Sequence, residues 1–179
     1  FFARTGYTGE DGMELVVPNN EIVGLWNKLL AAGVQPCGLG ARDTLRMEAG
    51  MMLYGQDMTQ KTTPLESGLS WTVKFEPEDR AFIGRGALLA QKAQGVTRKM
   101  VGLVMLDKGV MRSGQRVLVS GHEDGVVTSG GFSPTLNQSI ALARVPVECS
   151  GQVQIDIRGR LVAARVVKPR FVKNGQKLI

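Results

Sequence analysis

The pattern of apolar and polar positions changes near residue 95, and this change divides the chain into two parts. Before that point, segments 22–33 and 82–94 carry apolar residues at helical spacing, and 41–49 is rich in helix formers that stop at Gly50. Segments 13–17 and 69–75 alternate instead, which is typical of half-buried strands. The first part is therefore predicted to combine helices with a partial antiparallel sheet.

The two tryptophans are both interpreted as structural residues. Trp26 lies on the apolar face of the first predicted helix, which we expect to pack on a sheet, so Trp26 is predicted to belong to the core. Trp71 shares one face of the predicted strand 69–75 with Val73 and Phe75.

After residue 95, short alternating segments are separated by glycine turns. A tight hairpin connection is predicted at Arg158-Gly159-Arg160. So many short strands indicate a small antiparallel β-barrel or a sandwich. We therefore predict an α+β chain with two domains, 1–95 and 96–179. The six predicted strands are 100–106, 115–120, 124–129, 138–145, 152–158 and 161–168.

The composition excludes several classes of function. The chain has 179 residues, of which 43% are hydrophobic and 21% charged, as in an ordinary globular protein. No apolar run approaches the roughly 20 residues that a membrane span needs. With Cys37 and Cys149 far apart and His122 as the single histidine, neither a disulfide framework, a metal cluster nor a Ser-His-Asp enzyme is expected. His122 lies in a predicted exposed turn, where we expect it to be inert.

The net charge of +6 is concentrated at the C-terminal end. Residues 151–179 hold seven basic side chains against Asp156 alone, whereas the charges of 1–150 cancel. A basic tail indicates an acidic partner, such as nucleic acid, a polyanionic ligand or an acidic protein, or it is simply a solvated surface.

Two charged positions have both a structural and a functional interpretation. Arg42 and Arg46 stand four apart in the predicted helix 41–49, so they share a face and repel each other. Either nearby acidic residues and solvent compensate this repulsion, or a glycine-flanked arginine at a helix start binds an anionic ligand. Glu14, in the strand 13–17, is either solvent-facing or a ligand-binding group in a cleft.

Several separated motifs resemble the glycine cleavage system T-protein family, which comprises tetrahydrofolate-dependent aminomethyltransferases. The resemblance spans the whole chain in family order and implies an α+β folate-binding region followed by a C-terminal β-barrel. Because the family's protein is about twice as long and the chain begins at Phe1 without Met, we expect a fragment, the C-terminal half. Among the motifs are ARTGYTGEDGMEL at 3–15, PCGLGARDTLRMEAGMMLYGQDM at 36–58, TPLESGLSWTVKF at 63–75, TSGGFSPTL at 128–136 and KPRFVKNG at 168–175.

The resemblance implies a reaction and a set of partners. The family takes an aminomethyl group from the lipoyl arm of the H-protein, releases ammonia and passes the one-carbon unit to tetrahydrofolate, which is a substrate. The family's catalytic aspartate has no counterpart here, so no catalytic residue is assigned and the chain alone is expected to be inactive. No nucleic acid or membrane partner is expected, and the location is expected to be the bacterial cytoplasm or, in a eukaryote, the mitochondrial matrix.

The resemblance also decides between the interpretations of single residues. Tyr7, Glu14 and Arg42 match folate contacts of the family, Glu14 being the carboxylate that a pterin's paired donor edge requires. Arg46 and Trp71 keep their structural interpretation. In the basic tail, Lys173 or Lys177 is expected to attract either the glutamate tail of folate or the acidic H-protein.

Two other classes of protein remain as alternatives. A related folate-dependent demethylase, a sarcosine or dimethylglycine dehydrogenase or a folate-binding repair protein would share the fold, but such relatives usually depart from the GLGARDTLR and LYGQDM motifs. A basic barrel that binds nucleic acid would need aromatic residues interleaved with its charges, and the tail offers only Phe171.

Overall fold

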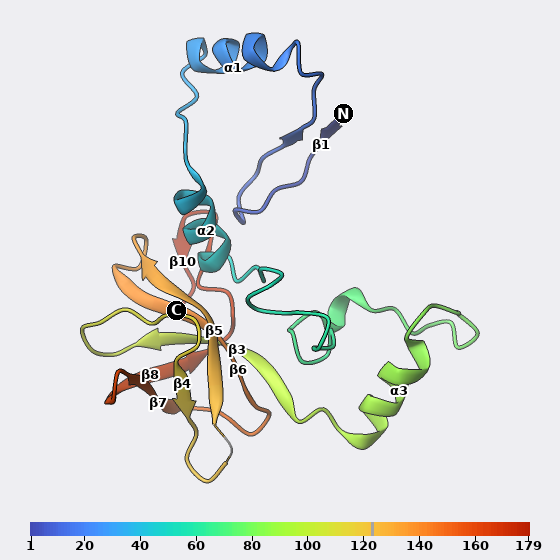
Figure 1. Cartoon of the computed structure of the whole chain (residues 1–179), viewed down its shortest axis with the longest axis vertical. Helices are drawn as coiled ribbons and strands as arrows, with labels where there is room; N and C mark the ends of the chain where they lie inside the picture. Colours follow the sequence, from blue (N-terminus) through green and yellow to red (C-terminus); the bar gives the residue numbers. More distant parts are fainter. Residues whose placement is uncertain (123) are drawn as a thin grey trace.

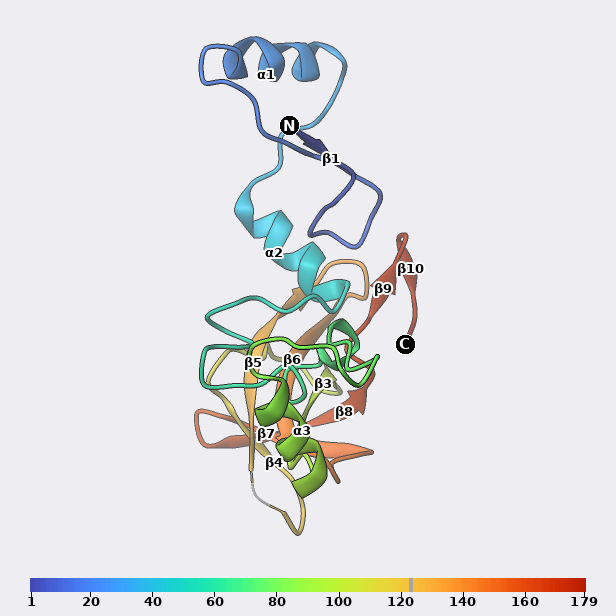
Figure 2. The same cartoon turned by 90° about the vertical axis from the view of Figure 1, so that its right-hand side faces the viewer.

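The computed structural model describes residues 1–122 and 124–179, which form an elongated molecule with a barrel at one end (Figure 1). A small hairpin and a helix lie at the opposite end, and α2 lies between that helix and the barrel (Figure 2). The elements before the barrel are β1 Phe2–Ala3, β2 Glu14–Leu15, α1 Ile22–Ala31, α2 Leu39–Glu48, the short 3-10 helix η1 Ser70–Thr72 and α3 Arg85–Gln94.

The C-terminal part is a closed six-stranded antiparallel barrel, as the family resemblance implied; the strand pattern alone had left a sandwich open. Its strands are hydrogen-bonded in the order β3-β6-β5-β4-β7-β8, so each strand has two neighbours. A final hairpin, β9 Val172–Lys173 with β10 Gln176–Lys177, follows it. The barrel strands are β3 Arg98–Met105, β4 Arg116–Leu118, β5 Gly125–Ser133, β6 Gln138–Pro146, β7 Gln152–Ile157 and β8 Arg160–Val167.

Strands β3 and β6 are buried on both faces because a second core covers the outside of the barrel there. Leu103 and Ala143 belong to the cluster inside the barrel, whereas the alternate residues Val104 and Leu142 belong to the second cluster. That second cluster also contains Met47, Ile140, Phe171 and Val172. Helix α2 and the C-terminal tail are therefore packed against the outside of the barrel.

The predicted hairpin turn between β7 and β8 is confirmed. Ile157 pairs with Arg160, which leaves a two-residue loop, and both Arg158 and Gly159 have positive φ, at 57° and 84°. Such angles at both central positions define the type I′ turn, whose twist matches that of the paired strands.

Two predictions for the first part were wrong. Segment 69–75 is not a strand: Thr72 donates its backbone N–H and its hydroxyl to the Leu69 carbonyl, so η1 forms local bonds in place of sheet bonds, and Trp71 is 80% exposed. Trp26 is 52% exposed, and no residue of α1 is buried, because α1 packs closely against none of the other described helices and strands.

The helices of this part agree with their predicted positions. α1, α2 and α3 fall within or close to the predicted segments 22–33, 41–49 and 82–94. The barrel strands begin at Arg98, and the division into domains at about residue 95 stays a prediction.

Candidate functional site

Tyr7 and Arg42, far apart in the sequence, are in direct contact. The Arg42 guanidinium carbon lies 4.6 Å from the centre of the Tyr7 ring, which is cation–π geometry. The Tyr7 hydroxyl donates to the Met52 carbonyl, so the ring is fixed at its edge as well as on its face. Burial raises the pKa of Tyr7, and the Arg46 charge opposes this shift.

The end of α2 explains where the Met52 carbonyl lies. Met51 N–H donates to the Arg46 carbonyl at 2.8 Å and Gly50 N–H to the Met47 carbonyl at 3.0 Å. With Gly50 at a φ of 74°, this is a Schellman ending, which turns the chain sharply after the helix. The sequence predicted the helix stop at Gly50.

The loop that carries Tyr7 is held on two further sides. Gly9 lies so close to α2 that an added Cβ would stand 2.4 Å from the Ala49 Cβ, and its φ is 76°. Glu10 Oε1 accepts a hydrogen bond of 3.0 Å from Gly175 N–H, in the turn between β9 and β10. Gly9 thus allows the close approach of this loop to α2, next to the C-terminal hairpin (Figure 2).

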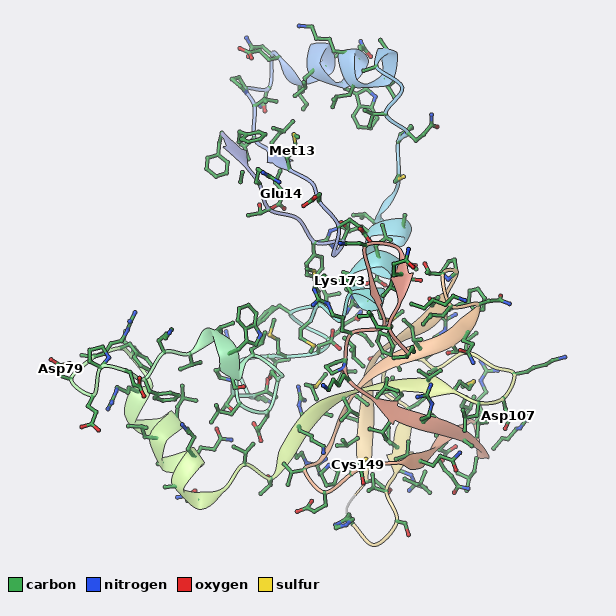
Figure 3. All side chains as sticks on the ribbon, turned by 180° about the vertical axis from the view of Figure 1, so that it is seen from behind. Met13, Glu14, Asp79, Asp107, Cys149 and Lys173 are labelled. Carbon is green, nitrogen blue, oxygen red and sulfur yellow. The ribbon has the colours of Figure 1, made fainter. Side chains whose placement is uncertain are left out.

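Glu14 lies in the hairpin β1–β2 and is exposed. Its carboxylate accepts a hydrogen bond from the Thr5 hydroxyl, and its Cα partner across the hairpin is Ala3. Figure 3 shows it in this hairpin, beyond α2 from the barrel. Tyr7 and Glu14 are thus carried by one loop and its flanking strand, and Tyr7 is the residue that contacts Arg42.

Lys173 and Lys177 lie in the same hairpin but on different faces of it. Lys173 pairs with Gln176, whereas Lys177 pairs with Val172, and neighbouring pairs in a ladder point to opposite faces. Figure 3 shows Lys173 on the strand beside α2. A single ligand on one face of the hairpin would therefore be reached more directly by one of these lysines than by the other.

A buried polar cluster lies between α2 and the barrel, and the sequence did not predict it. Arg46 is 1% exposed and donates from Nη1 to Asp57 Oδ2 at 2.8 Å. Its Nη2 donates to the Ser129 hydroxyl at 3.0 Å, and Thr128 donates its hydroxyl to Asp57 Oδ1. The structural interpretation of Arg46 is confirmed, and its role is that of a buried ion pair. Asp57 and Thr128 lie in the LYGQDM and TSGGFSPTL motifs, and these motifs are the only sign of the buried cluster in the sequence.

A second buried carboxylate joins the same helix to the same strand. Glu48, the last residue of α2, accepts from the Ser133 hydroxyl and, at 2.9 Å, from the Thr135 hydroxyl. Its backbone carbonyl accepts from Phe171 N–H at 2.9 Å. The end of α2 is thus bonded both to β5 and to the C-terminal tail.

The residues considered for metal or thiol chemistry are dispersed. Across 1–122 and 124–179, no three His, Cys, Asp or Glu side chains are grouped as metal ligands, and no helix is long and apolar enough to cross a membrane. His122 is exposed in a turn, with Nδ1 4.0 Å from Glu148. Cys37 is exposed and Cys149 is buried, and both are free thiols.

Comparison with protein families gives two matches in sequence order. Residues 1–77 match the family described as the GCVT N-terminal domain, and residues 98–173 match the glycine cleavage T-protein C-terminal barrel domain. The first match contains Tyr7, Glu14 and Arg42, and the second contains the closed barrel and Lys173.

Curated relatives agree with these matches. The chain is 70% identical to an aminomethyltransferase of Legionella pneumophila over 98% of its own length and 49% of the relative's. It is 58% identical to an aminomethyltransferase of Methylococcus capsulatus over its whole length and 50% of that protein's. The chain therefore spans about half the length of the curated relatives it matches.

The fold agrees as well. The crystal structure of glycine cleavage system aminomethyltransferase T from Bartonella henselae matches 96% of this chain and 49% of its own, with a TM-score of 0.89 and 38% sequence identity. Both family matches, the relatives and this structure point to one family, and the motifs at 3–15 and 36–58 are among those on which the sequence alone predicted it. The chain belongs to the glycine cleavage T-protein family, of which it represents the C-terminal half.

Proposed function

We propose that this chain is the C-terminal half of a tetrahydrofolate-dependent aminomethyltransferase of the glycine cleavage system. The enzyme takes the aminomethyl group from the lipoyl arm of the H-protein, releases ammonia and transfers the one-carbon unit to tetrahydrofolate. The observation that carries the proposal is the contact between Tyr7 and Arg42, two of the residues that match the family's folate contacts, within a chain 70% identical to an aminomethyltransferase.

Each proposed folate residue has a chemical role that its surroundings support. Glu14 is an exposed carboxylate, which suits the paired 2-amino and N3–H donors of a pterin. Tyr7 and Arg42 present an aromatic ring and a guanidinium already held in contact, so little conformational entropy is lost when a ligand binds them. Lys173 or Lys177 supplies positive charge for the glutamate tail or for the H-protein.

The chain's contribution to the reaction is binding and positioning. Transfer requires N5 of the pterin near the one-carbon unit and the exclusion of water, which a rigid site provides. No residue of this chain is proposed as catalytic, and the chain alone is proposed to be inactive. The related demethylases and dehydrogenases are not favoured, because the curated relatives are named aminomethyltransferases; since they are bacterial, we place the enzyme in the bacterial cytoplasm.

A chimera tests the function without assumptions about the rest of the protein. This chain replaces the matching half of the Legionella pneumophila aminomethyltransferase, to which it is 70% identical. We expect the chimera to bind tetrahydrofolate and to form methylenetetrahydrofolate from aminomethyl-lipoyl H-protein, whereas the 179-residue chain alone forms none. A folded chimera without folate binding, or activity of the chain alone, would contradict the proposal.

Glu14→Ala in the chimera tests the proposed pterin contact. Loss of hydrogen bonds to a charged group should raise the tetrahydrofolate Kd about tenfold or more. Asp11→Ala removes an exposed carboxylate from the same loop and serves as the matched control. Calorimetric Kd values that change equally in both variants would return Glu14 to a purely structural role.

A further inference from the structure

A fully buried carboxylate, Asp57, connects the barrel to the elements that carry Tyr7 and Arg42. Its Oδ2 atom accepts hydrogen bonds from Arg46 Nη1 and Leu53 N–H, both at 2.8 Å, and from the Ser129 hydroxyl at 2.9 Å. The Thr128 hydroxyl donates to Oδ1. These partners come from three separate segments, namely α2, the loop after it and strand β5.

Two of these partners, Leu53 and Arg46, lie next to or one helical turn from residues that contact Tyr7. Leu53 follows Met52, whose carbonyl accepts the Tyr7 hydroxyl, and Asp57 N–H donates back to the Leu53 carbonyl at 2.8 Å. Arg46 stands one helical turn after Arg42, whose guanidinium covers the Tyr7 ring. The hydrogen-bond acceptor and the stacking partner of Tyr7 are thus both placed by elements bonded to Asp57.

The electrostatics of Tyr7 agree with this connection. Burial is the main cause that raises the pKa of Tyr7; the charges of Arg46 and Arg42 lower it, and those of Asp57 and Asp43 raise it. Both members of the buried ion pair therefore lie close enough to act on the phenol.

We propose that Asp57 is a positioning residue of the folate site, which holds α2 and the loop after it so that Tyr7 and Arg42 stay in contact. Asp57 does not touch the ligand in this proposal, because its side chain is fully buried. The identity of the ligand as tetrahydrofolate rests on the proposed function, whereas the effect of Asp57 on Tyr7 does not.

The chain contains its own control for this proposal. Glu48 is a second buried carboxylate that bonds α2 to β5, yet its side chain bonds to Ser133 and Thr135 and not to the loop that carries Met52. Ser129 and Ser133 form a matched pair as well: both are buried in β5, and each donates its hydroxyl to one of the two carboxylates. We call Asp57 with Ser129 the Asp57 branch, and Glu48 with Ser133 the Glu48 branch. If both branches were merely structural, substitutions in either would affect ligand binding equally.

The first test measures tetrahydrofolate Kd calorimetrically in the chimera and its variants. We expect Asp57→Asn to raise Kd at least about tenfold, since small displacements of positioning groups are costly, while Glu48→Gln stays within about twofold although both lower the melting temperature. If Asp57→Asn does not fold, Ser129→Ala is compared with Ser133→Ala, and we expect the larger increase in Kd for Ser129→Ala. Equal effects of the two branches, or no effect of the Asp57 branch, would overturn the proposal.

The second test needs no folate. In the 179-residue chain carrying Tyr54→Phe, Tyr7 is the single tyrosine, and the ultraviolet absorbance of its phenolate reports its titration. Ser129→Ala changes no charge, so loosening of Tyr7 should move its pKa down toward the ordinary value, while Ser133→Ala leaves it unchanged. An unchanged Tyr7 in Ser129→Ala would refute the positioning role. If the parent chimera binds no tetrahydrofolate, the proposed function fails and this titration alone decides the role of Asp57.

Discussion

Replacing Arg46 by methionine should destabilise the chain by about 3–5 kcal/mol, because the change leaves Asp57 as a buried carboxylate without its cationic partner. Arg46 and Asp57 are 1% and 0% exposed, so water cannot take over the lost interaction. Methionine keeps much of the aliphatic volume of arginine, so the cavity that forms is small. The predicted loss is therefore mainly electrostatic.

The structure indicates which of the two ion pairs of Arg46 dominates. Arg46 Nε lies 2.8 Å from Asp43, but the Asp43 side chain is 55% exposed, and such a pair contributes about 0–1 kcal/mol. Arg46 Nη1 lies 2.8 Å from Asp57, and this pair is fully buried. Removing one partner of the buried pair carries nearly the whole cost.

A double-mutant cycle measures the interaction. Arg46→Met, Asp57→Asn and the double variant are unfolded in urea and followed by far-ultraviolet circular dichroism, because both tryptophans are exposed and report burial poorly. Since the double variant contains neither buried charge, its loss should be smaller than the sum of the single losses by about 2–3 kcal/mol. Asp43→Asn is the control and should cost about 1 kcal/mol or less.

The reasoning would be refuted if the two single losses added to within about 0.5 kcal/mol, since independent sites behave in that way. The comparison requires equal slopes of the free energy against urea concentration in all four proteins, because a changed slope reports a change in the unit that unfolds.

Three further predictions concern other parts of the chain. Gly50→Ala should lower the free energy of urea unfolding by more than about 2 kcal/mol, because φ is 74° and the new Cβ would lie 1.3 Å from the carbonyl oxygen of a proline in the tail. The control Gly33→Ala, with a φ of 85° and open space, should cost only about 1 kcal/mol, and equal losses would contradict this. Cys149 should react with a disulfide reagent at least about a hundredfold more slowly than the exposed Cys37, because burial raises the pKa of its thiol and reaction requires local opening. Comparable rates for the two cysteines would contradict the burial of Cys149. One of the variants Lys173→Gln and Lys177→Gln should weaken binding of a polyglutamylated folate by about fivefold and the other much less, since the two lysines lie on opposite faces of their hairpin. Equal losses of affinity in calorimetry would contradict this.

The barrel was the most predictable part of the molecule because each strand pattern reports a local property. In β7, Val153 and Ile155 are buried while Gln152 and Gln154 are exposed, and this alternation is legible in the sequence without knowledge of the partner strand. The turn at Arg158-Gly159 is similarly local. What the alternation cannot give is the order of strands, since β4 pairs with β5 and β7, and β3 pairs with β6 and β8.

The first part was less predictable because its patterns depend on surfaces that the chain covers only slightly. The apolar spacing that places Trp26 on one face of α1 is correct for a helix, yet none of that face is buried. In 69–75 the alternation predicted a strand, but local bonds to the Leu69 carbonyl formed a 3-10 helix instead. Periodicity indicates which residues share a face, and it does not supply the partner that would cover that face.

Only a part of the candidate site could likewise be predicted from the sequence. Tyr7 and Arg42 were predicted from motifs that resemble the family, and the structure brings them into contact. Asp57 was not predicted, because its role depends on Thr128, 71 residues away, and on Ser129, 72 residues away. A single sequence contains no signal for pairs so distant, and an aspartate in a short polar stretch has the pattern of an exposed turn.

The position of the Tyr7 loop gives the barrel a part in the candidate site, because two supports of this loop are themselves held by the barrel. The loop is bonded to the segment after α2 through Met52 and to the C-terminal hairpin through Glu10 and Gly175. Both of those supports are anchored on the barrel, the first through Asp57 and β5, and the second through the packing of Phe171 on the outer core. Since binding loops depend on the rigidity of the scaffold beneath them, the barrel fixes the site from two directions.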